Sequence, residues 1–314
     1  MTSYRKVQNI KIAIVDYPHC LKSALYGFFE VFNLANQVCA EQGLLYRFYP
    51  QILDYNEQIN FAGDTFNVIL LPPSNRSEFY LNPSQHLINS LLHQYHMGAS
   101  ICSACAGTFI LAATGLLQNK EATTHWKLEA LFREKFPEVQ LNTDKIIINQ
   151  GDVITAGGMM SWLDLGLEVI CKYTKPSVIS SLGKYLVIDT GQREQRFYRQ
   201  FTPILNHGDA LILSIQQTLN NNFHLAQSIA DIAEKNCLTE RTFLRRFVKA
   251  TQLKPKQYIQ HLRIQKACDL LESTNLSFEL IANQVGYQDC GACRKVFIRS
   301  VGLTPSEFRK RFVE

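Results

Sequence analysis

The sequence predicts an α/β domain, with a parallel sheet covered by helices on both faces, followed by an all-α domain that holds two helix–turn–helix units. Three observations support this prediction. Short apolar runs alternate with helical patterns over the first part of the chain, almost purely helical patterns follow, and one segment of the second part is repeated. The 314 residues, 46% of them apolar, are enough for two domains with a core each.

The first domain is predicted from the order of its strands and helices. Strands are expected where short apolar runs occur, at 11–18, 45–53, 66–73 and 99–105. Helices are expected where apolar residues recur at helical spacing, at 24–43, 85–98, 106–117 and 161–174. Residues 145–158 are predicted to form a pair of hairpin strands. Regular alternation of this kind favours a parallel sheet between two layers of helices.

The excess of positive over negative charge lies entirely in the last third of the chain. The net charge is +5, but residues 1–207 hold 17 Lys and Arg against 17 Asp and Glu, whereas residues 208–314 hold 15 against 10. A basic module appended to a neutral domain is typical of nucleic-acid binding. We therefore expect a first domain at 1–190, a polar linker at 191–209 and a DNA-binding domain at 210–314.

An internal repeat defines the second domain. Residues 239–259 align with 289–309 at an offset of 50, and a short helical pattern precedes each copy. The preceding helices are expected to bury Ile229 and Ala233 in one copy and Leu280, Ala282 and Val285 in the other. Four positions match between the copies: Phe247 with Phe297, Leu253 with Leu303, Pro255 with Pro305, and Tyr258 with Phe308.

The second helix of each copy is predicted to enter a DNA groove. Thr239 is placed to cap the first of these helices, and burial of Phe243, Phe247 and Val248 would leave a polar face exposed. The exposed residues would be Arg241, Thr242, Leu244, Arg245 and Lys249 in the first copy, and Gly291, Ala292, Arg294 and Lys295 in the second. The long helix at 254–274 could hold the two about 34 Å apart, one turn of DNA. The alternative is a helical bundle with solvated basic faces.

These motifs resemble the AraC/XylS family of bacterial transcription regulators. "TERTFLRRF", P-x-x-Y-I at 255–259, R-I-x-x-A-x-x-L-L at 263–271 and "GYQDCGACRKVFIRSVGLTPSEFRKRF" carry the resemblance, which covers 210–312. It implies base contacts from Arg241, Leu244 and Arg245 in the first helix and from Gly291, Ala292, Arg294 and Lys295 in the second. Family members usually have Ser at the position of Gly291 and a large apolar residue at that of Cys293, so the first helix is expected to carry more of the specificity.

Nine cysteines in irregular spacings favour reduced thiols over a disulfide framework, and Cys39, Cys171 and Cys268 stand in apolar surroundings. Two Cys-x-x-Cys pairs, Cys102/Cys105 and Cys290/Cys293, raise the question of a zinc site. The pairs are more than 180 residues apart and the second lies on a predicted helix, so we expect neither a metal nor a cofactor.

The stretch "ICSACAGTF" predicts a nucleophile elbow, because a strand runs through small residues and a cysteine into a helix that begins near Gly107. Cys105 would occupy the turn and Cys102 the end of the buried strand. A thiol beside a helix N-terminus is expected to have a lowered pKa, which favours the thiolate.

The wider stretch "CSACAGTFILAATGLLQNKEATTHW", with "TAGG" and "DLGLEVI", resembles the ThiJ/PfpI branch of the class I glutamine-amidotransferase-like superfamily over residues 8–185. The resemblance implies a flavodoxin-like fold and an elbow cysteine that works with an acidic residue and sometimes a histidine. His125 is the candidate histidine, although a structural role beside Trp126 is equally open. Ala24 stands at the expected acidic position. Of the nearby carboxylates, Asp16 is expected to close a strand, and Glu30 is expected to lie at a helix or subunit contact.

Together these features predict a transcription regulator, an activator by resemblance, rather than an enzyme. A small-molecule effector would bind near Cys105, Ala106, Gly107 and His125, and the resemblance implies an amine, an amino acid or a betaine. It also implies a homodimer, double-stranded DNA as a partner, and contact with RNA polymerase. The alternatives are a cysteine-dependent amidase or hydratase with a DNA-binding tail, a redox sensor at Cys105, and a first domain that is only a dimerisation scaffold. The N-terminus is charged and no run reaches ~20 apolar residues, so we expect a cytoplasmic protein with no membrane span.

Overall fold

The computed structural model describes residues 7–55, 61, 63–190 and 194–313. The chain divides into two compact units, Met1–Gln195 and Arg196–Glu314. The first three residues of the expected linker, 191–193, lie outside the described residues. No helix among the described residues is long and apolar enough to cross a membrane.

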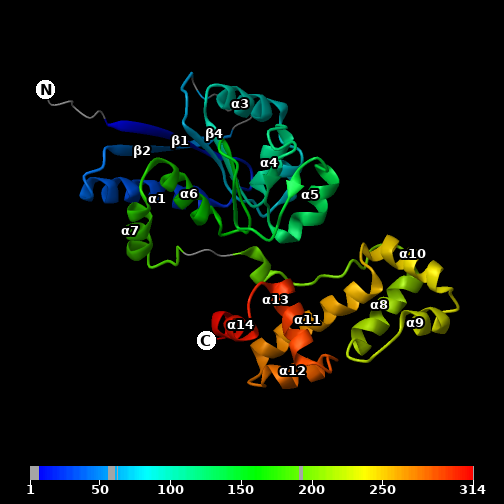
Figure 1. Ribbon diagram of the computed structural model, residues 1–314. Helices are drawn as coiled ribbons and strands as arrows, with labels where there is room; N and C mark the ends of the chain where they lie inside the picture. The colour runs from blue at the N-terminus through cyan, green and yellow to red at the C-terminus, as the bar shows by residue number, and fades with distance from the viewer. Residues whose placement is uncertain (1–6, 56–60, 62, 191–193, 314) are drawn as a thin grey trace. The chain divides into compact units, whose positions relative to one another are not determined.

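A six-stranded sheet forms the centre of the N-terminal unit (Figure 1). Its order is β2-β1-β3-β4-β8-β7; the first five strands run parallel to their neighbours, and β7 pairs antiparallel with β8. The strands are β1 (Gln8–Asp16), β2 (Tyr46–Asp54), β3 (Val68–Leu71), β4 (Ser100–Ala104), β7 (Ile147–Asn149) and β8 (Val153–Ala156). All residues of β3, β4 and β8 are buried, as expected for strands covered on both faces.

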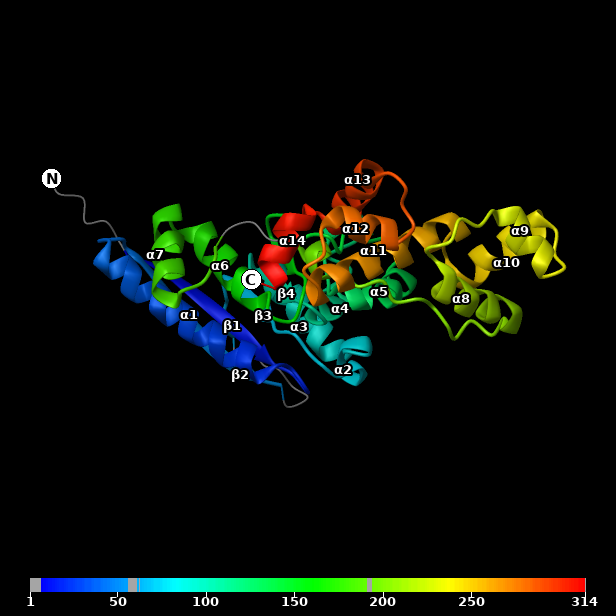
Figure 2. The same cartoon turned by 90° about the horizontal axis from the view of Figure 1, so that it is seen from below.

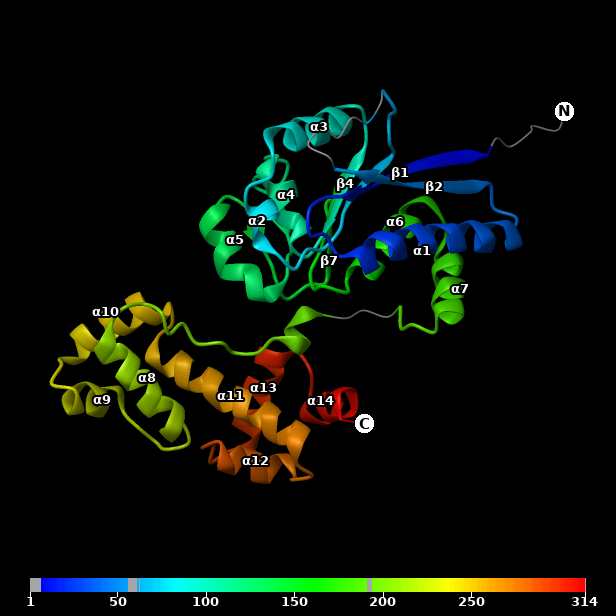
Figure 3. The ribbon, with the colours of Figure 1, turned by 180° about the vertical axis from the view of Figure 1, so that it is seen from behind.

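Helices cover both faces of the sheet, which confirms the predicted α/β class. Figures 1 and 3 show α1, α6 and α7 on one face and α3 and α4 on the other. The helices are α1 (Lys22–Glu41), α2 (Ser77–Leu81), α3 (Gln85–His96), α4 (Gly107–Ala113), α5 (Glu129–Lys135), α6 (Trp162–Tyr173) and α7 (Pro176–Leu186). Sequence patterns did not predict α2, α5, α7 or the small parallel sheet of β5 (Glu121–Ala122) and β6 (Gln140–Leu141).

The C-terminal unit is helical and has two hydrophobic cores. Its helices are α8 (Ala210–Asn222), α9 (Ile229–Lys235), α10 (Glu240–Thr251), α11 (Pro255–Ser273), α12 (Phe278–Gln284), α13 (Cys290–Val301) and α14 (Pro305–Phe312). The first core gathers side chains from α8 to α10 and the start of α11, and the second gathers those of the rest of α11 and of α12 to α14. Figure 2 shows α11 running between the two groups of helices.

The sequence repeat is also a structural repeat. The Phe247 ring meets Tyr258 edge to face at 5.3 Å in the first core, and Phe297 meets Phe308 in the same way at 5.7 Å in the second. Both α10 and α13 end at a residue in the left-handed region, Gln252 with φ 61° and Gly302 with φ 84°. The helix that follows begins in each copy with a proline at its first turn, a position that tolerates the missing N–H.

Candidate elbow site and nucleic-acid interface

Cys105 occupies a sharp turn between β4 and α4, as the sequence predicted. Its backbone φ is 55°, in the left-handed region that non-glycine residues rarely adopt. Other segments hold the turn by hydrogen bonds: the Cys105 N–H donates to the Ala156 carbonyl at 2.7 Å, and the Thr124 hydroxyl donates to the Cys105 carbonyl at 2.7 Å. A Cβ on Gly107 would lie 2.5 Å from the Leu71 carbonyl oxygen, so only glycine lets α4 start this close to β3.

The pKa of the Cys105 thiol is raised, whereas the sequence led us to expect a lowered pKa. The residue is 2% exposed, and burial raises the pKa of its thiol to about 12. Two buried tyrosines, Tyr17 and Tyr80, lie near enough for Cys105 to contribute to their own raised pKa values, which burial dominates. A helix N-terminus is worth at most ~1–2 kcal/mol, whereas full burial moves a pKa by several units. The seven-residue α4 therefore does not overcome desolvation.

Carboxylates near the start of α1 are engaged elsewhere or exposed. Ala24 is fully buried in α1. Asp16 closes β1 and accepts from the Lys22 ammonium at 2.6 Å and from the Cys20 thiol at 3.2 Å. Glu30 lies on an exposed position of α1. The candidate acid position thus holds an apolar side chain in the core of the unit.

His125 lies directly after Thr124, whose hydroxyl binds the elbow. Its Nδ1 accepts from the Lys127 N–H at 3.1 Å and caps a short 3₁₀ helix over Trp126–Leu128, and its ring lies 5.6 Å from that of Trp126. Burial and then the nearby Lys127 lower its pKa, which keeps the imidazole neutral at pH 7. These contacts give His125 a structural role as a helix cap.

Gln195 is a buried residue near the elbow that the sequence did not single out. It is 3% exposed, and its amide nitrogen donates to the Thr123 hydroxyl at 3.0 Å, the Thr124 carbonyl at 3.0 Å and the Lys145 carbonyl at 2.9 Å. A Cβ on Gly157 would lie 1.7 Å from that nitrogen, so Gly157 makes room for it. Thr124 therefore links Cys105 to Gln195, the last residue of the N-terminal unit.

The predicted groove-facing residues line α10 and α13 of the C-terminal unit. Thr239 caps α10 as predicted, accepting from the Thr242 N–H at 3.2 Å. Asp289 caps α13 through the Gly291 N–H at 2.7 Å. Exposed positions are Arg241, Arg245 and Lys249 on α10 and Gly291, Ala292, Arg294 and Lys295 on α13; Thr242 and Leu244 are partly buried.

Three burial predictions were wrong. Val248 is 38% exposed, and Ala250 and Thr251 are buried on α10 in its place. Leu280 is 52% exposed, and the neighbouring Ile281 faces the core. Val248 follows the buried Phe247 and Leu280 precedes the buried Ile281, so the apolar pattern alone fits either of two adjacent positions as the core face. Cys171 is also exposed rather than in apolar surroundings, whereas Cys39 and Cys268 are buried as expected.

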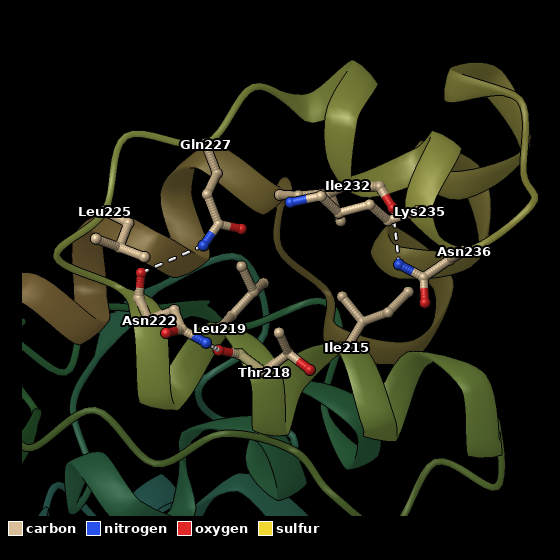
Figure 4. A pocket seen from close by; sticks show the side chains of 9 residues that line it. All are labelled: Ile215, Thr218, Leu219, Asn222, Leu225, Gln227, Ile232, Lys235 and Asn236. Carbon is tan, nitrogen blue, oxygen red and sulfur yellow. Dashed lines mark hydrogen bonds between the residues drawn. The ribbon is translucent and has the colours of Figure 1, made fainter.

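Two cavities lie in the C-terminal unit. One of about 230 Å³ lies between α8 and α9, where the side chains of Ile215, Leu219 and Ile232 point into it (Figure 4), and none of its lining residues is a predicted base contact. The other, of about 550 Å³, lies where the start of α8 meets α10 and is lined by Asp209, Arg246 and Lys249 among others. Within the described ranges, no group of three or more His, Cys, Asp or Glu side chains could hold a metal ion.

Comparison with known families assigns both units. Residues 46–172 match the DJ-1/PfpI family, and residues 232–311 match a helix-turn-helix domain family. The chain thus combines a DJ-1/PfpI-type domain with a helix-turn-helix domain of the AraC type. The first match includes the elbow at Cys105, and the second runs from α9 to α14.

The chain is similar to transcriptional regulators of Pseudomonas aeruginosa. It is 27% identical to ArgR over 217 residues, which make up 68% of this chain and 65% of ArgR. It is 22% identical to GbdR over 224 residues, 71% of this chain and 61% of GbdR. The chain thus spans less than two thirds of the length of these relatives. A crystal structure of a candidate transcriptional regulator from Vibrio parahaemolyticus has the same fold, with a TM-score of 0.50 and 20% identity over 57% of this chain and all of that chain.

The two departures from the AraC/XylS pattern have different structural consequences. Cys293 is fully buried in the second core beside Phe297, where a larger apolar side chain is usual in the family. A Cβ on the exposed Gly291 would lie 3.1 Å from an oxygen of Asp289, so a side chain there needs only a small shift. The second helix–turn–helix unit therefore has a smaller core side chain and no side chain at Gly291.

Proposed function

We propose that this protein is a sequence-specific DNA-binding transcription regulator. The observation that carries the proposal is the structural repeat of α9–α10 and α12–α13, in which each second helix is capped at its start and presents an exposed basic face. Arginine on such a face can bind guanine through two hydrogen bonds in the major groove. Arg241, Leu244 and Arg245 would contact bases from α10, and Gly291, Ala292, Arg294 and Lys295 would lie against the groove from α13.

Lys249 would contact the DNA backbone rather than a base. It lines the cavity of about 550 Å³ at the start of α8, beside Arg246 and the first backbone N–H groups of that helix. Cationic side chains and a helix N-terminus favour a phosphate oxygen there, although Asp209 opposes it. Phosphate contacts add affinity and salt dependence without sequence discrimination.

Alanine substitutions test this division of roles. A DNA sequence is first selected from a random duplex library with the full chain. Arg241→Ala and Arg245→Ala should each lose about 1–3 kcal/mol of discrimination between the selected and a scrambled duplex. Lys249→Ala should weaken both complexes alike and reduce the salt slope by about one. Lys266→Ala, which removes an exposed charge from α11, is the control and should leave discrimination unchanged. Unchanged binding by all three test variants would refute the proposed docking.

The N-terminal DJ-1/PfpI domain would act as the sensor. Its effector would bind near Cys105, Ala106, Gly107 and His125 and shift the way the recognition helices are presented. The family resemblance points to an amine, an amino acid or a betaine. A nucleophilic role for Cys105 gains no support, because its thiol pKa is raised to about 12 and Ala24 takes the acidic position. We also propose a cytoplasmic homodimer that activates transcription through contact with RNA polymerase.

Effector binding can be tested on the full chain by its thermal stability. Amines, amino acids and betaines are screened one by one for a concentration-dependent rise in the melting temperature followed by tryptophan fluorescence. Both tryptophans, Trp126 and Trp162, lie in the N-terminal unit, so the signal reports that unit alone. A hit whose effect Cys105→Ser weakens, with DNA binding retained, supports the sensor. Turnover that Cys105→Ser abolishes would instead support an enzyme, and the absence of any hit would support a scaffold.

A further inference from the structure

Helix α11 changes from one hydrophobic core to the other within three residues. Tyr258 and Leu262 belong to the first core, and Ile264 and Leu271 belong to the second. Arg263 stands between these two sets, at the point where the helix leaves one helix–turn–helix unit and enters the other. Its guanidinium is therefore placed where the two units meet.

Arg263 donates hydrogen bonds to backbone carbonyls of both helix–turn–helix units. Its Nε donates to the Phe223 carbonyl at 2.7 Å and its Nη2 to the Leu225 carbonyl at 3.2 Å, both in the segment between α8 and α9. Its Nη1 donates to the Gly286 carbonyl at 2.9 Å, in the turn between α12 and α13. The guanidinium carbon also lies 5.4 Å from the centre of the Tyr287 ring, a cation–π distance. One planar side chain thus joins three carbonyls from the two helix–turn–helix units.

The two segments bound by Arg263 also touch each other. Gly286 has φ +90°, and a Cβ there would lie 2.3 Å from the His224 carbonyl oxygen. Backbone can approach backbone this closely only at glycine. Phe223, next to His224, packs against the first core and the second core alike. The segment between α8 and α9 therefore contacts the second helix–turn–helix unit through both its backbone and its side chains.

We propose that Arg263 is a positioning residue that fixes the separation and rotation of α10 relative to α13. One chain would then accept a single spacing between its two half-sites on DNA, where a half-site is the sequence contacted by one of these two helices. This inference rests on the proposed DNA-binding function. Each recognition helix is held by its own core, and α11 alone would let the cores twist about a single helix. Charge-assisted hydrogen bonds to carbonyls of both units remove that freedom, and a guanidinium fork fits them in one orientation.

The test measures affinity against half-site spacing. The full chain first selects its two half-sites from random DNA, and duplexes are then made with the spacer shortened or lengthened by one or two base pairs. One base pair changes the separation by about 3.4 Å and the rotation by about 35°. The wild-type chain should lose about tenfold in affinity per base pair of change, on the order of one mismatched position. Arg263→Met should lose about threefold or less while it prefers the same half-site sequences.

Two further variants separate this role from general stability. Lys266→Met removes an exposed charge from the same helix and should keep the wild-type spacing dependence. Gly286→Ala leaves Arg263 in place but forces the turn away from His224, and it should shift the preferred spacing or broaden it. Gly286→Ala disturbs the contact between the Gly286 turn and the His224 segment without changing Arg263. It therefore still tests whether this contact sets the spacing if Arg263→Met fails to fold.

The possible failures are distinguishable. Wild-type spacing dependence in Gly286→Ala and in any folded Arg263→Met protein overturns the positioning role and leaves the DNA-binding function intact. If the wild-type chain selects no DNA sequence at all, the proposed function falls, and the role of Arg263 falls with it.

Discussion

The Thr124 hydroxyl donates a 2.7 Å hydrogen bond to the carbonyl oxygen of Cys105. Thr124 is fully buried, and its own carbonyl accepts from the Gln195 amide at 3.0 Å. A single threonine therefore holds the strained elbow on one side and the last residue of the N-terminal unit on the other. Any rearrangement of the elbow must break or move one of these bonds.

Loss of the Thr124 hydroxyl should destabilise the N-terminal unit. Thr124→Val keeps the shape of the side chain and removes the donor to Cys105, so the free energy of unfolding should fall by about 1 kcal/mol. The Cys105 carbonyl keeps a longer bond from the Thr108 N–H, which limits the loss. Urea denaturation followed by tryptophan fluorescence measures the change, and Thr124→Ser, which retains a hydroxyl, is the control. Equal stability of wild type and Thr124→Val would show that the hydroxyl contributes nothing.

The Cys105 thiol should be inert in the folded protein. Its pKa of about 12 and its 2% exposure leave almost no accessible thiolate at pH 8. A thiol reagent should therefore label the exposed Cys171 and Cys237 first, and Cys105 only when the unit unfolds. Peptide mapping by mass spectrometry after short labelling reads this out. Rapid labelling of Cys105 under native conditions would contradict its burial and would revive the redox hypothesis.

Gly157 and Gln195 should be coupled. Gly157→Ala places a methyl group against the Gln195 amide and should cost about 1–3 kcal/mol of unfolding free energy in the N-terminal unit. Gln195→Ala removes the hydrogen bonds that its amide donates to the Thr123 hydroxyl and to the Thr124 and Lys145 carbonyls, and it should cost a similar amount. The double variant should lose less than the sum, because the clash and the lost bonds share one site. If the losses in unfolding free energy of the two single variants added up to that of the double variant, the Gln195 side chain would not lie against Gly157.

Acid should weaken the contact between α8 and α10. The Arg246 guanidinium, 2.7 Å from the Asp209 carboxylate, holds the pKa of that carboxyl below its ordinary value of 3.8. A carboxyl with a depressed folded-state pKa adds stability above its unfolded pKa and loses it as the pH falls through the folded pKa. Asp209→Asn keeps a cap for the Ile212 N–H but removes the charge. The difference in melting temperature between wild type and Asp209→Asn should therefore be largest above pH 5 and shrink below pH 4. A difference that does not vary with pH would exclude this ion pair as its source.

Local patterns predicted the main strands and helices of the chain, but not its buried contacts. The strand before Cys105, the glycine after it and the cap at Thr239 each depend on neighbours within a few residues, so the sequence carries them directly. The carbonyls of Thr124 and Lys145 that bind Gln195 lie 71 and 50 residues away along the chain. Local sequence periodicity does not predict contacts at such separations. The same holds for Arg263, whose partners at Phe223 and Gly286 are 40 and 23 residues away.

The error over the Cys105 thiol has a different origin. The sequence correctly places the thiol at a helix start, where the field of the helix favours the thiolate. It does not show that Cys105 is 2% exposed, and desolvation outweighs the helix. Burial at a turn depends on side chains from distant segments, and the buried Tyr17 and Tyr80 lie near enough to Cys105 to interact with it electrostatically.

The most direct test of DNA recognition is the affinity of the full chain for its selected duplex against a scrambled duplex, measured at several salt concentrations. We predict that the selected duplex binds at least about 10³-fold more tightly at physiological salt. Combined Arg241→Ala and Arg245→Ala substitutions should remove most of that ratio, while the Lys266→Ala control retains it. Equal affinity of the wild-type chain for both duplexes, or a ratio that survives loss of both arginines, would contradict recognition by α10.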